Sequence, residues 1–133
     1  MPTVYDHFAV LKPDLLLDQL KVSPEIYQTL DTRYNGFGSH TLIAAHEFDS
    51  DWPTWEIHPA GDEMVILLSG DIAFVLRQDS SDRLIKLEKP GAFLIVPRNT
   101  WHTARVGKSA NVLFITPGEG TLNETSPPTS ASG

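Results

Sequence analysis

Two stretches decide the fold: EIHPAGDEMVILLSG at residues 56–70 and GAFLIVPRNTWH at residues 91–102. Each joins an apolar run to a turn rich in Pro, Gly or Asn, which is typical of short β-strands linked by tight turns. Alternate residues of a strand share one face, so Glu56 and His58 point the same way. A turn after His58 reverses the chain, and we expect a hairpin to put Glu63 opposite this pair. His102 opens a later strand, which can face them across a closed barrel.

These four side chains form a candidate site for a divalent metal ion. Two imidazoles and two carboxylates are suitable ligands for Fe, Mn, Ni, Cu or Zn. The alternative for His58 and His102 is a pair of hydrogen-bonded barrel histidines that hold no metal. The alternative for Glu63 is a structural carboxylate paired with Arg98 or Arg105.

The rest of the chain also favours an all-β domain. Ten prolines and nine glycines separate short apolar runs. Turn signals recur about every 8–12 residues, which indicates a sandwich or a barrel. Strands are expected over residues 40–48, 54–58, 63–68, 71–77, 84–87, 92–96, 101–106 and 111–116.

The N-terminal segment is expected to add a strand and a helix. Residues 7–12 predict an edge strand, and residues 15–22 fit either a helix or a strand. Ser23 is a suitable N-cap and Pro24 a suitable first helical residue. A helix is therefore predicted from this point to about Thr32.

The first stretch resembles the first sequence motif of the cupin family. That motif has His-x-His, three or four residues, Glu, six residues and Gly. This chain has Glu56-Ile57-His58, four residues, Glu63, six residues and Gly70.

The second stretch resembles the second cupin motif, which has Gly, five residues, Pro-x-Gly, two residues and His, often followed three residues later by Asn. This chain has Gly91, five residues, Pro97-Arg98-Asn99, two residues and His102. Three departures stand out: Glu56 replaces the first His, Asn99 replaces the Gly, and Val106 replaces the Asn. Asn also tolerates a left-handed turn conformation.

The resemblance implies an all-β fold, a cupin double-stranded β-helix of the jelly-roll type with a short N-terminal helix. We expect one domain over residues 1–121 and a disordered tail over residues 122–133, where Ser, Thr and Pro prevail. The resemblance also implies that His58, Glu63 and His102 bind a divalent ion such as Fe, Mn, Ni or Zn. Glu56 is either a fourth ligand or a nearby general base, and thus the candidate catalytic residue.

The function implied is that of a metal-binding cupin that acts on, or binds, a small organic molecule. Chemistry of the oxygenase, isomerase or lyase type is open, because the fold does not fix the reaction. Two alternatives stay open beside it. One is a non-catalytic cupin that senses or binds a small ligand. The other is a metal-free cupin, in keeping with the departures at Glu56 and Val106.

The composition limits which binding partners and which cellular compartment we expect. The formal net charge is −7, which disfavours nucleic acid as a partner. The chain has no cysteine, which excludes disulfides and thiolate nucleophiles. We expect a cytoplasmic protein, since no apolar run is long enough to span a membrane and the N-terminus does not read as a signal peptide.

Two expected strands, residues 64–68 and 92–96, are apolar on both faces. Their outward faces need cover, which we expect from the N-terminal segment and from the second subunit of a homodimer. The alternative is that a second sheet of the same chain covers them.

Strand parity predicts which other residues line a pocket. Thr54 and Ala104 share the parity of the candidate ligands and are expected to line it. Trp55 alternates away from Glu56 and is expected on the outer face. His46 lies on an expected strand and could line the pocket, but the surface or an interface is the favoured place for it.

Overall fold

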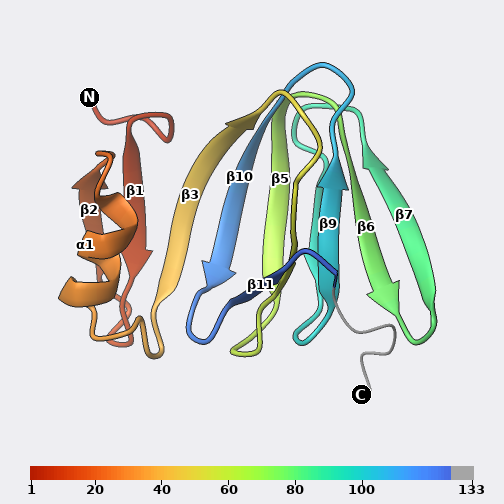
Figure 1. Ribbon diagram of the computed structural model, residues 1–133. Helices are drawn as coiled ribbons and strands as arrows, with labels where there is room; N and C mark the ends of the chain where they lie inside the picture. Colours follow the sequence, from red (N-terminus) through yellow and green to blue (C-terminus); the bar gives the residue numbers. More distant parts are fainter. Residues whose placement is uncertain (127–133) are drawn as a thin grey trace.

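The computed structural model describes residues 1–126 as two antiparallel β-sheets packed face to face, with one short helix in the N-terminal part (Figure 1). The first sheet has the strand order β2-β1-β3-β10-β5-β8, and the second has β11-β4-β9-β6-β7. The elements are β1 (His7–Leu11), β2 (Leu17–Lys21), α1 (Ile26–Arg33), β3 (Thr41–Phe48), β4 (Trp55–Ile57), β5 (Glu63–Gly70), β6 (Ile72–Gln78), β7 (Ser81–Leu87), β8 (Phe93–Val96), β9 (Trp101–Arg105), β10 (Ala110–Pro117) and β11 (Leu122–Glu124). Every strand expected from residue 40 onward is present, which confirms the all-β fold. Among the described residues, no helix is long and apolar enough to cross a membrane.

The core lies between the inner faces of the two sheets. Every second residue is buried along β5 and β10, so Val65 and Val112 point inward from the first sheet. Phe74 and Leu76 of β6 meet them from the second sheet, and Phe74 is 0% exposed. Burial of each such side chain contributes roughly 1.5–3 kcal/mol. These interlocked faces hold the strands that carry the candidate site.

The N-terminal segment widens the first sheet and covers its inner face with α1. β1 pairs with both β2 and β3, so the prediction of an edge strand at residues 7–12 is wrong, and β2 lies at the edge instead. Of the two alternatives for residues 15–22, the strand is the one that forms. Phe8 and Leu20 of these strands belong to one buried cluster with Leu30 of α1.

The helix begins later than the sequence predicts. Its N-cap is Glu25, which makes no side-chain capping bond. Ser23, the predicted cap, instead offers its carbonyl oxygen to the Ile26 N–H at 3.1 Å. A short helix without a cap depends on tertiary packing. Here the buried Ile26 supplies it, together with Tyr34 just beyond the helix, whose hydroxyl donates to the Asp18 carboxylate at 2.7 Å.

Two residues with left-handed backbones fix one turn in each of the two sequence motifs. Gly70 has φ +80°, and a Cβ there would lie 2.1 Å from the Ser109 carbonyl oxygen, so only glycine fits. Asn99 has φ 60°, as expected for a residue in place of the motif glycine. Its N–H donates to the carbonyl oxygen of His58 at 3.2 Å. This bond ties the second sequence motif to the first.

The last strand lies in the segment that the sequence predicts as a tail. Leu122–Glu124 forms β11 and pairs with β4, with Asn123 opposite Glu56. Ordered structure therefore extends past the predicted boundary at residue 121. Residues 127–133, the rest of the predicted tail, lie outside the described residues. The pairing places β11 beside the candidate site.

Candidate metal centre

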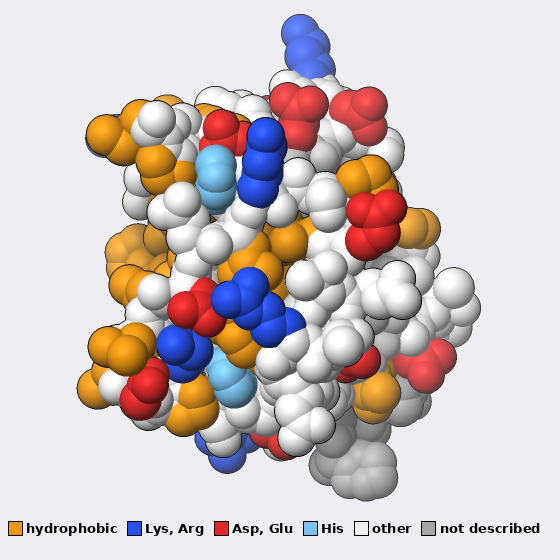
Figure 2. Space-filling view, turned by 90° about the vertical axis from the view of Figure 1, so that its left-hand side faces the viewer, with side chains coloured by type: hydrophobic (Ala, Val, Ile, Leu, Met, Phe, Trp, Pro, Cys, Tyr) orange, Lys and Arg blue, Asp and Glu red, His pale blue; other side chains and the backbone are white. Residues whose placement is uncertain are grey.

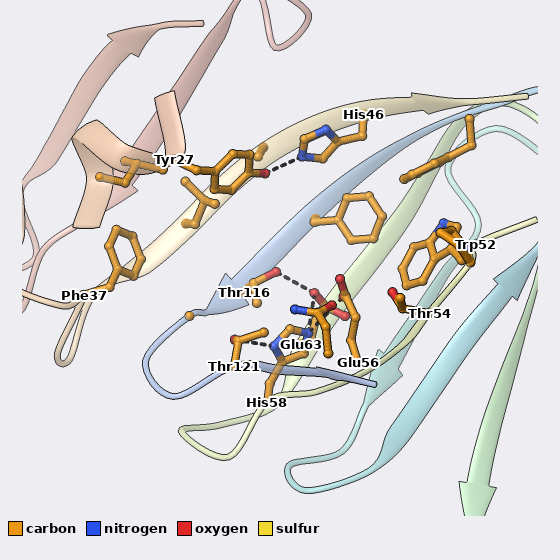
Figure 3. Close-up of a pocket in the computed structure, with 18 of the residues that line it drawn as sticks. Tyr27, Phe37, His46, Trp52, Thr54, Glu56, His58, Glu63, Thr116 and Thr121 are labelled. Carbon is orange, nitrogen blue, oxygen red and sulfur yellow. Dashed lines mark hydrogen bonds and ion pairs between the residues drawn. The ribbon is translucent and has the colours of Figure 1, made fainter. Parts of the chain in front are cut away.

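The structure brings Glu56, His58, Glu63 and His102 together, as the sequence predicts (Figure 3 shows the first three). Glu56 of β4 and His102 of β9 are direct partners across the second sheet. Glu63 begins β5 in the first sheet and meets them from the opposite layer. The predicted hairpin between the strands of Glu56 and Glu63 is therefore wrong, because the turn after His58 carries the chain from one sheet to the other.

Short distances join the four side chains around one point. Glu63 lies between the histidines, with Oε2 at 3.3 Å from His58 Nε2 and Oε1 at 3.1 Å from His102 Nε2. Glu56 Oε1 is farther away, at 3.7 Å from His58 Nε2 and 4.0 Å from His102 Nε2. The ligand atoms of Glu56, His58 and His102 all lie within 4.8 Å of one another. Metal bonds of about 2.0–2.2 Å put neighbouring ligand atoms roughly 3–3.5 Å apart, so Glu63 and the histidines already have the required spacing.

Hydrogen bonds from outside the cluster hold the ligand side chains in place. His102 Nδ1 lies 3.0 Å from the Thr100 carbonyl oxygen. A carbonyl only accepts, so Nδ1 carries the proton of the neutral ring and Nε2 keeps a free lone pair. His58 Nδ1 is 2.8 Å from the Thr121 hydroxyl, which can accept the Nδ1 proton in the same way. The Thr116 hydroxyl donates to Glu63 Oε2 at 2.6 Å.

Three atoms of the cluster are buried without a hydrogen-bond partner among the described residues: His58 Nε2, His102 Nε2 and Glu63 Oε1. They lie close to one another, in ion-pair contact through the Glu63 carboxylate but without hydrogen-bond geometry. A buried polar atom without a partner costs about 1–3 kcal/mol, and three together need a common explanation. A cation at their centre would bind all three, so this donor set fits a metal ion.

The charges in the cluster are strongly coupled. Burial by itself would raise the pKa of Glu63, but His102 and His58 beside it lower that pKa to about 2. Burial by itself would lower the pKa of His102, but the Glu63 carboxylate outweighs it and raises the pKa. Burial and the Glu63 charge raise the pKa of Glu56. Glu63 is therefore the firmly ionised carboxylate of the pair.

A cavity of about 770 Å³ opens beside the cluster and reaches to α1. Its wall includes the aromatic side chains Phe48, Trp52 and Phe114. Figure 3 shows the cluster residues at one end of this wall and Tyr27 with His46 at the other. The cluster thus has direct access to a space of the size that small organic ligands occupy.

The outcome for the predicted pocket residues is mixed. Thr54 lines the cavity as predicted, and Trp55 lies outside it, beneath the Arg77 guanidinium at 4.3 Å. Ala104 packs in the core instead of lining the cavity. His46 lines it, which is the less favoured of the two places that the sequence left open, and its Nε2 is 2.8 Å from the Tyr27 hydroxyl.

Tyr27 is a pocket residue that the sequence analysis missed. It comes from α1, and no local pattern shows that this helix lies over the open end of the barrel. Burial, with the charge of Glu56, raises the pKa of Tyr27 to about 12, and burial lowers the pKa of His46. Both side chains are therefore neutral near pH 7.

Comparison with known proteins finds solved structures of similar fold. The sequence matches no protein-family model and no curated protein. A cupin-2 domain protein of Shewanella frigidimarina matches in structure with a TM-score of 0.50 and 18% identity, over 58% of this chain and 70% of its own. A cupin protein of Bacteroides fragilis matches with a TM-score of 0.50 and 17% identity, over 60% and 67%. Peruvianin-I of Thevetia peruviana latex, described as a cysteine peptidase, matches with a TM-score of 0.50 and 18% identity, over 62% and 54%. At these identities the likeness concerns the fold alone.

Proposed function

The chain has the cupin fold, and from this premise we propose that it is a metal-dependent protein that binds and transforms a small organic molecule. Glu56, His58, Glu63 and His102 are the proposed metal ligands. The observation that carries the proposal is the convergence of His58 Nε2, His102 Nε2 and Glu63 Oε1, all buried and all without a hydrogen-bond partner. Glu63 also forms ion pairs with both imidazoles, at 3.1 and 3.3 Å, as it would in a cluster of structural histidines, so the metal content decides between the two readings.

A divalent ion held there would supply Lewis acidity next to the cavity, or a position at which a small oxygen ligand could bind. The residues of the chain do the rest. Thr121 and the Thr100 carbonyl orient the two imidazoles. Glu56 is the most exposed of the four, with 30% of its side chain accessible, and it lines the cavity. We assign it the role of the group that takes up or returns a proton at the substrate, in addition to a weak ligand role.

Elemental analysis tests the metal proposal. The untagged protein is incubated with Fe, Mn, Ni and Zn in turn, freed of excess metal, and compared with His102→Ala and Glu63→Gln. We expect about one ion per chain in the wild type and a large loss in both variants. Glu63→Gln keeps the side chain's shape, so circular dichroism should show that the variant is folded. His7→Ala is the control, because His7 lies outside the cluster and pairs with Asp6.

Two results would contradict the proposal. One is a wild-type protein that binds none of the four metals. The other is a folded His102→Ala variant that keeps its full metal content. In either case a cupin that binds its ligand without metal would be the better account, and a screen for bound organic molecules would replace the search for a reaction.

We further propose that the chain forms a homodimer through the outer face of the first sheet. On the edge strand β8, Phe93 and Ile95 are 56% and 52% exposed. They pair with Ile66 and Met64 of β5, and the band continues across β10 and β3. A side view onto β2 and α1 shows hydrophobic side chains along the left-hand margin of the molecule (Figure 2). A band of this kind needs a cover in water.

Sedimentation velocity tests the homodimer. The wild type should sediment as a dimer at tens of micromolar, and Ile95→Lys should shift it towards the monomer. A wild type that stays monomeric at that concentration would refute the proposal.

A further inference from the structure

We propose that the cavity selects an amphipathic organic cation, an amine attached to an aromatic or apolar body, over a carboxylate of the same shape. This inference rests on the proposed small-molecule site and names its substrate class. It follows from the charges on the wall, from the charge of the ligand set and from the aromatic surface between them.

The charged side chains on the cavity wall are all of one sign. Five acidic residues line it: Asp31, Asp49, Asp51, Glu56 and Glu63. Glu47 also borders the cavity, but its side chain alternates away from that of His46 and faces outward from β3. No Lys or Arg is among the lining residues that the structure describes. Recognition of carboxylates and phosphates relies on Arg or Lys. An anionic substrate would therefore enter this cavity without a cationic side chain to receive it.

The chain does place cationic side chains in another hollow. A separate hollow of about 280 Å³ is lined by Lys86 and Arg105 together with Asp71 and Glu88. Cationic side chains are thus available on β7 and β9 of the second sheet, and they do not line the large cavity. The charged residues that line the large cavity are therefore all acidic because of where the fold places them. The net charge of −7 does not by itself explain this.

The ligand set does not offer a positive charge either. Glu56 and Glu63 carry two negative charges, which balance the two positive charges of a divalent ion. A cupin with His at the position of Glu56 would keep one net positive charge at its metal. Glu56 in place of His therefore removes the attraction that the metal would exert on an anionic substrate. The acidic residues of the cavity wall still attract a cation.

Two further observations indicate that the large cavity binds a small-molecule ligand. Glu63 and His58 line the cavity and are 2% and 5% exposed, with Glu63 Oε1 and His58 Nε2 unpartnered. Between them and α1 lies a continuous aromatic surface, in which Trp52 has ring centroids 5.5 Å from Phe48 and 6.0 Å from Phe114. Aromatic faces bind organic cations through the ring quadrupole, and they pack against apolar bodies.

Three probes with one body and three charges test the proposal: 2-phenylethylamine, 2-phenylethanol and phenylacetate. Binding to the Zn²⁺-incubated protein is measured by calorimetry near pH 7. We expect the ammonium to bind at least about tenfold more tightly than phenylacetate, with the alcohol between them. Equal or tighter binding of phenylacetate would overturn the proposal, and so would the absence of amine binding at millimolar concentration.

A rim variant tests the cause of the preference. Asp31→Asn combined with Asp49→Asn removes two carboxylates from the wall without touching the metal cluster. We expect amine affinity to fall by about twofold per charge at low salt and the metal content to stay unchanged. Glu88→Gln in the separate hollow is the matched control and should leave amine affinity unchanged. Equal losses in the rim variant and in this control would contradict the assigned cause.

The same titrations on chelator-treated protein separate this inference from the proposed metal function. Without a metal ion the acidic residues of the wall remain, so the preference for the amine should persist. If no metal binds but the amine is still preferred, the metal function fails and the substrate class stands. If metal binds and phenylacetate is preferred, the substrate class fails alone.

Discussion

Replacing Thr121 by Val should weaken metal binding although Thr121 is not a ligand. Val keeps the side chain's shape but removes the hydroxyl 2.8 Å from His58 Nδ1. That hydroxyl is the hydrogen-bond partner of Nδ1, and by accepting the Nδ1 proton it supports the tautomer whose Nε2 lone pair faces the cluster. Loss of tautomer selection alone costs about twofold in affinity, because the two forms of a free neutral ring are of comparable energy. Loss of ring orientation and basicity adds to it, and together such changes typically cost about 10–100-fold.

Competition with a chromophoric zinc chelator measures this loss directly. Thr103→Val is the matched control, because the Thr103 hydroxyl donates to the Thr54 carbonyl at 2.9 Å and touches neither imidazole. Each variant loses one hydrogen bond, worth about 0.5–1.5 kcal/mol of stability, so the two should unfold at similar urea concentrations. Only Thr121→Val should lose zinc affinity. The reasoning is refuted if Thr121→Val binds zinc as tightly as the wild type, or if the control loses affinity equally.

Three further predictions concern the fold and its pH dependence. Phe74→Ala should lower the free energy of unfolding in urea by about 3–5 kcal/mol, because Phe74 is 0% exposed at the centre of the core. A decrease of less than about 1 kcal/mol would mean that the sheets do not pack as described. Gly70→Ala should destabilise by more than about 1 kcal/mol, since its Cβ would lie 2.1 Å from the Ser109 carbonyl oxygen; an unchanged melting temperature would contradict this turn. Burial raises the pKa of Tyr34 to about 12, helped by its bond to Asp18. The unfolded state loses this proton first, so stability should be intact below about pH 10 and fall as pH rises towards 12. A phenolate absorbance titration in which all tyrosines of the folded protein ionise near pH 10 would argue against the buried placement of Tyr34.

Local chemistry explains why the cupin fold could be predicted from the sequence. The alternation that puts Glu56 and His58 on one face depends only on the period of a strand. The left-handed backbone at Asn99 depends only on the tolerance of that side chain. Each of these signals depends on only a few neighbouring residues. They were enough to predict the four cluster residues and the main strands. The resemblance to cupins that these motifs carry is confirmed by the fold.

The parts that could not be predicted depend on long-range pairing. Nothing near Glu63 shows that its strand belongs to the opposite sheet from Glu56. Nothing in α1 shows that Tyr27 reaches His46, which lies 19 residues further along the chain. The strand at Leu122–Glu124 is exposed and polar, and only its pairing with β4 orders it. In each case tertiary contacts outweigh local propensity.

The most direct test of the metal site is a crystal structure of the protein grown with zinc, with anomalous diffraction recorded on both sides of the zinc edge. The account predicts one strong anomalous peak at about 2.0–2.2 Å from the Nε2 atoms of His58 and His102 and from a Glu63 oxygen. The Glu56 carboxylate should lie at or near bonding distance of the same ion. A cluster without a peak, with Glu63 hydrogen-bonded to both imidazoles, would contradict the central claim, and so would a zinc ion bound only elsewhere on the surface.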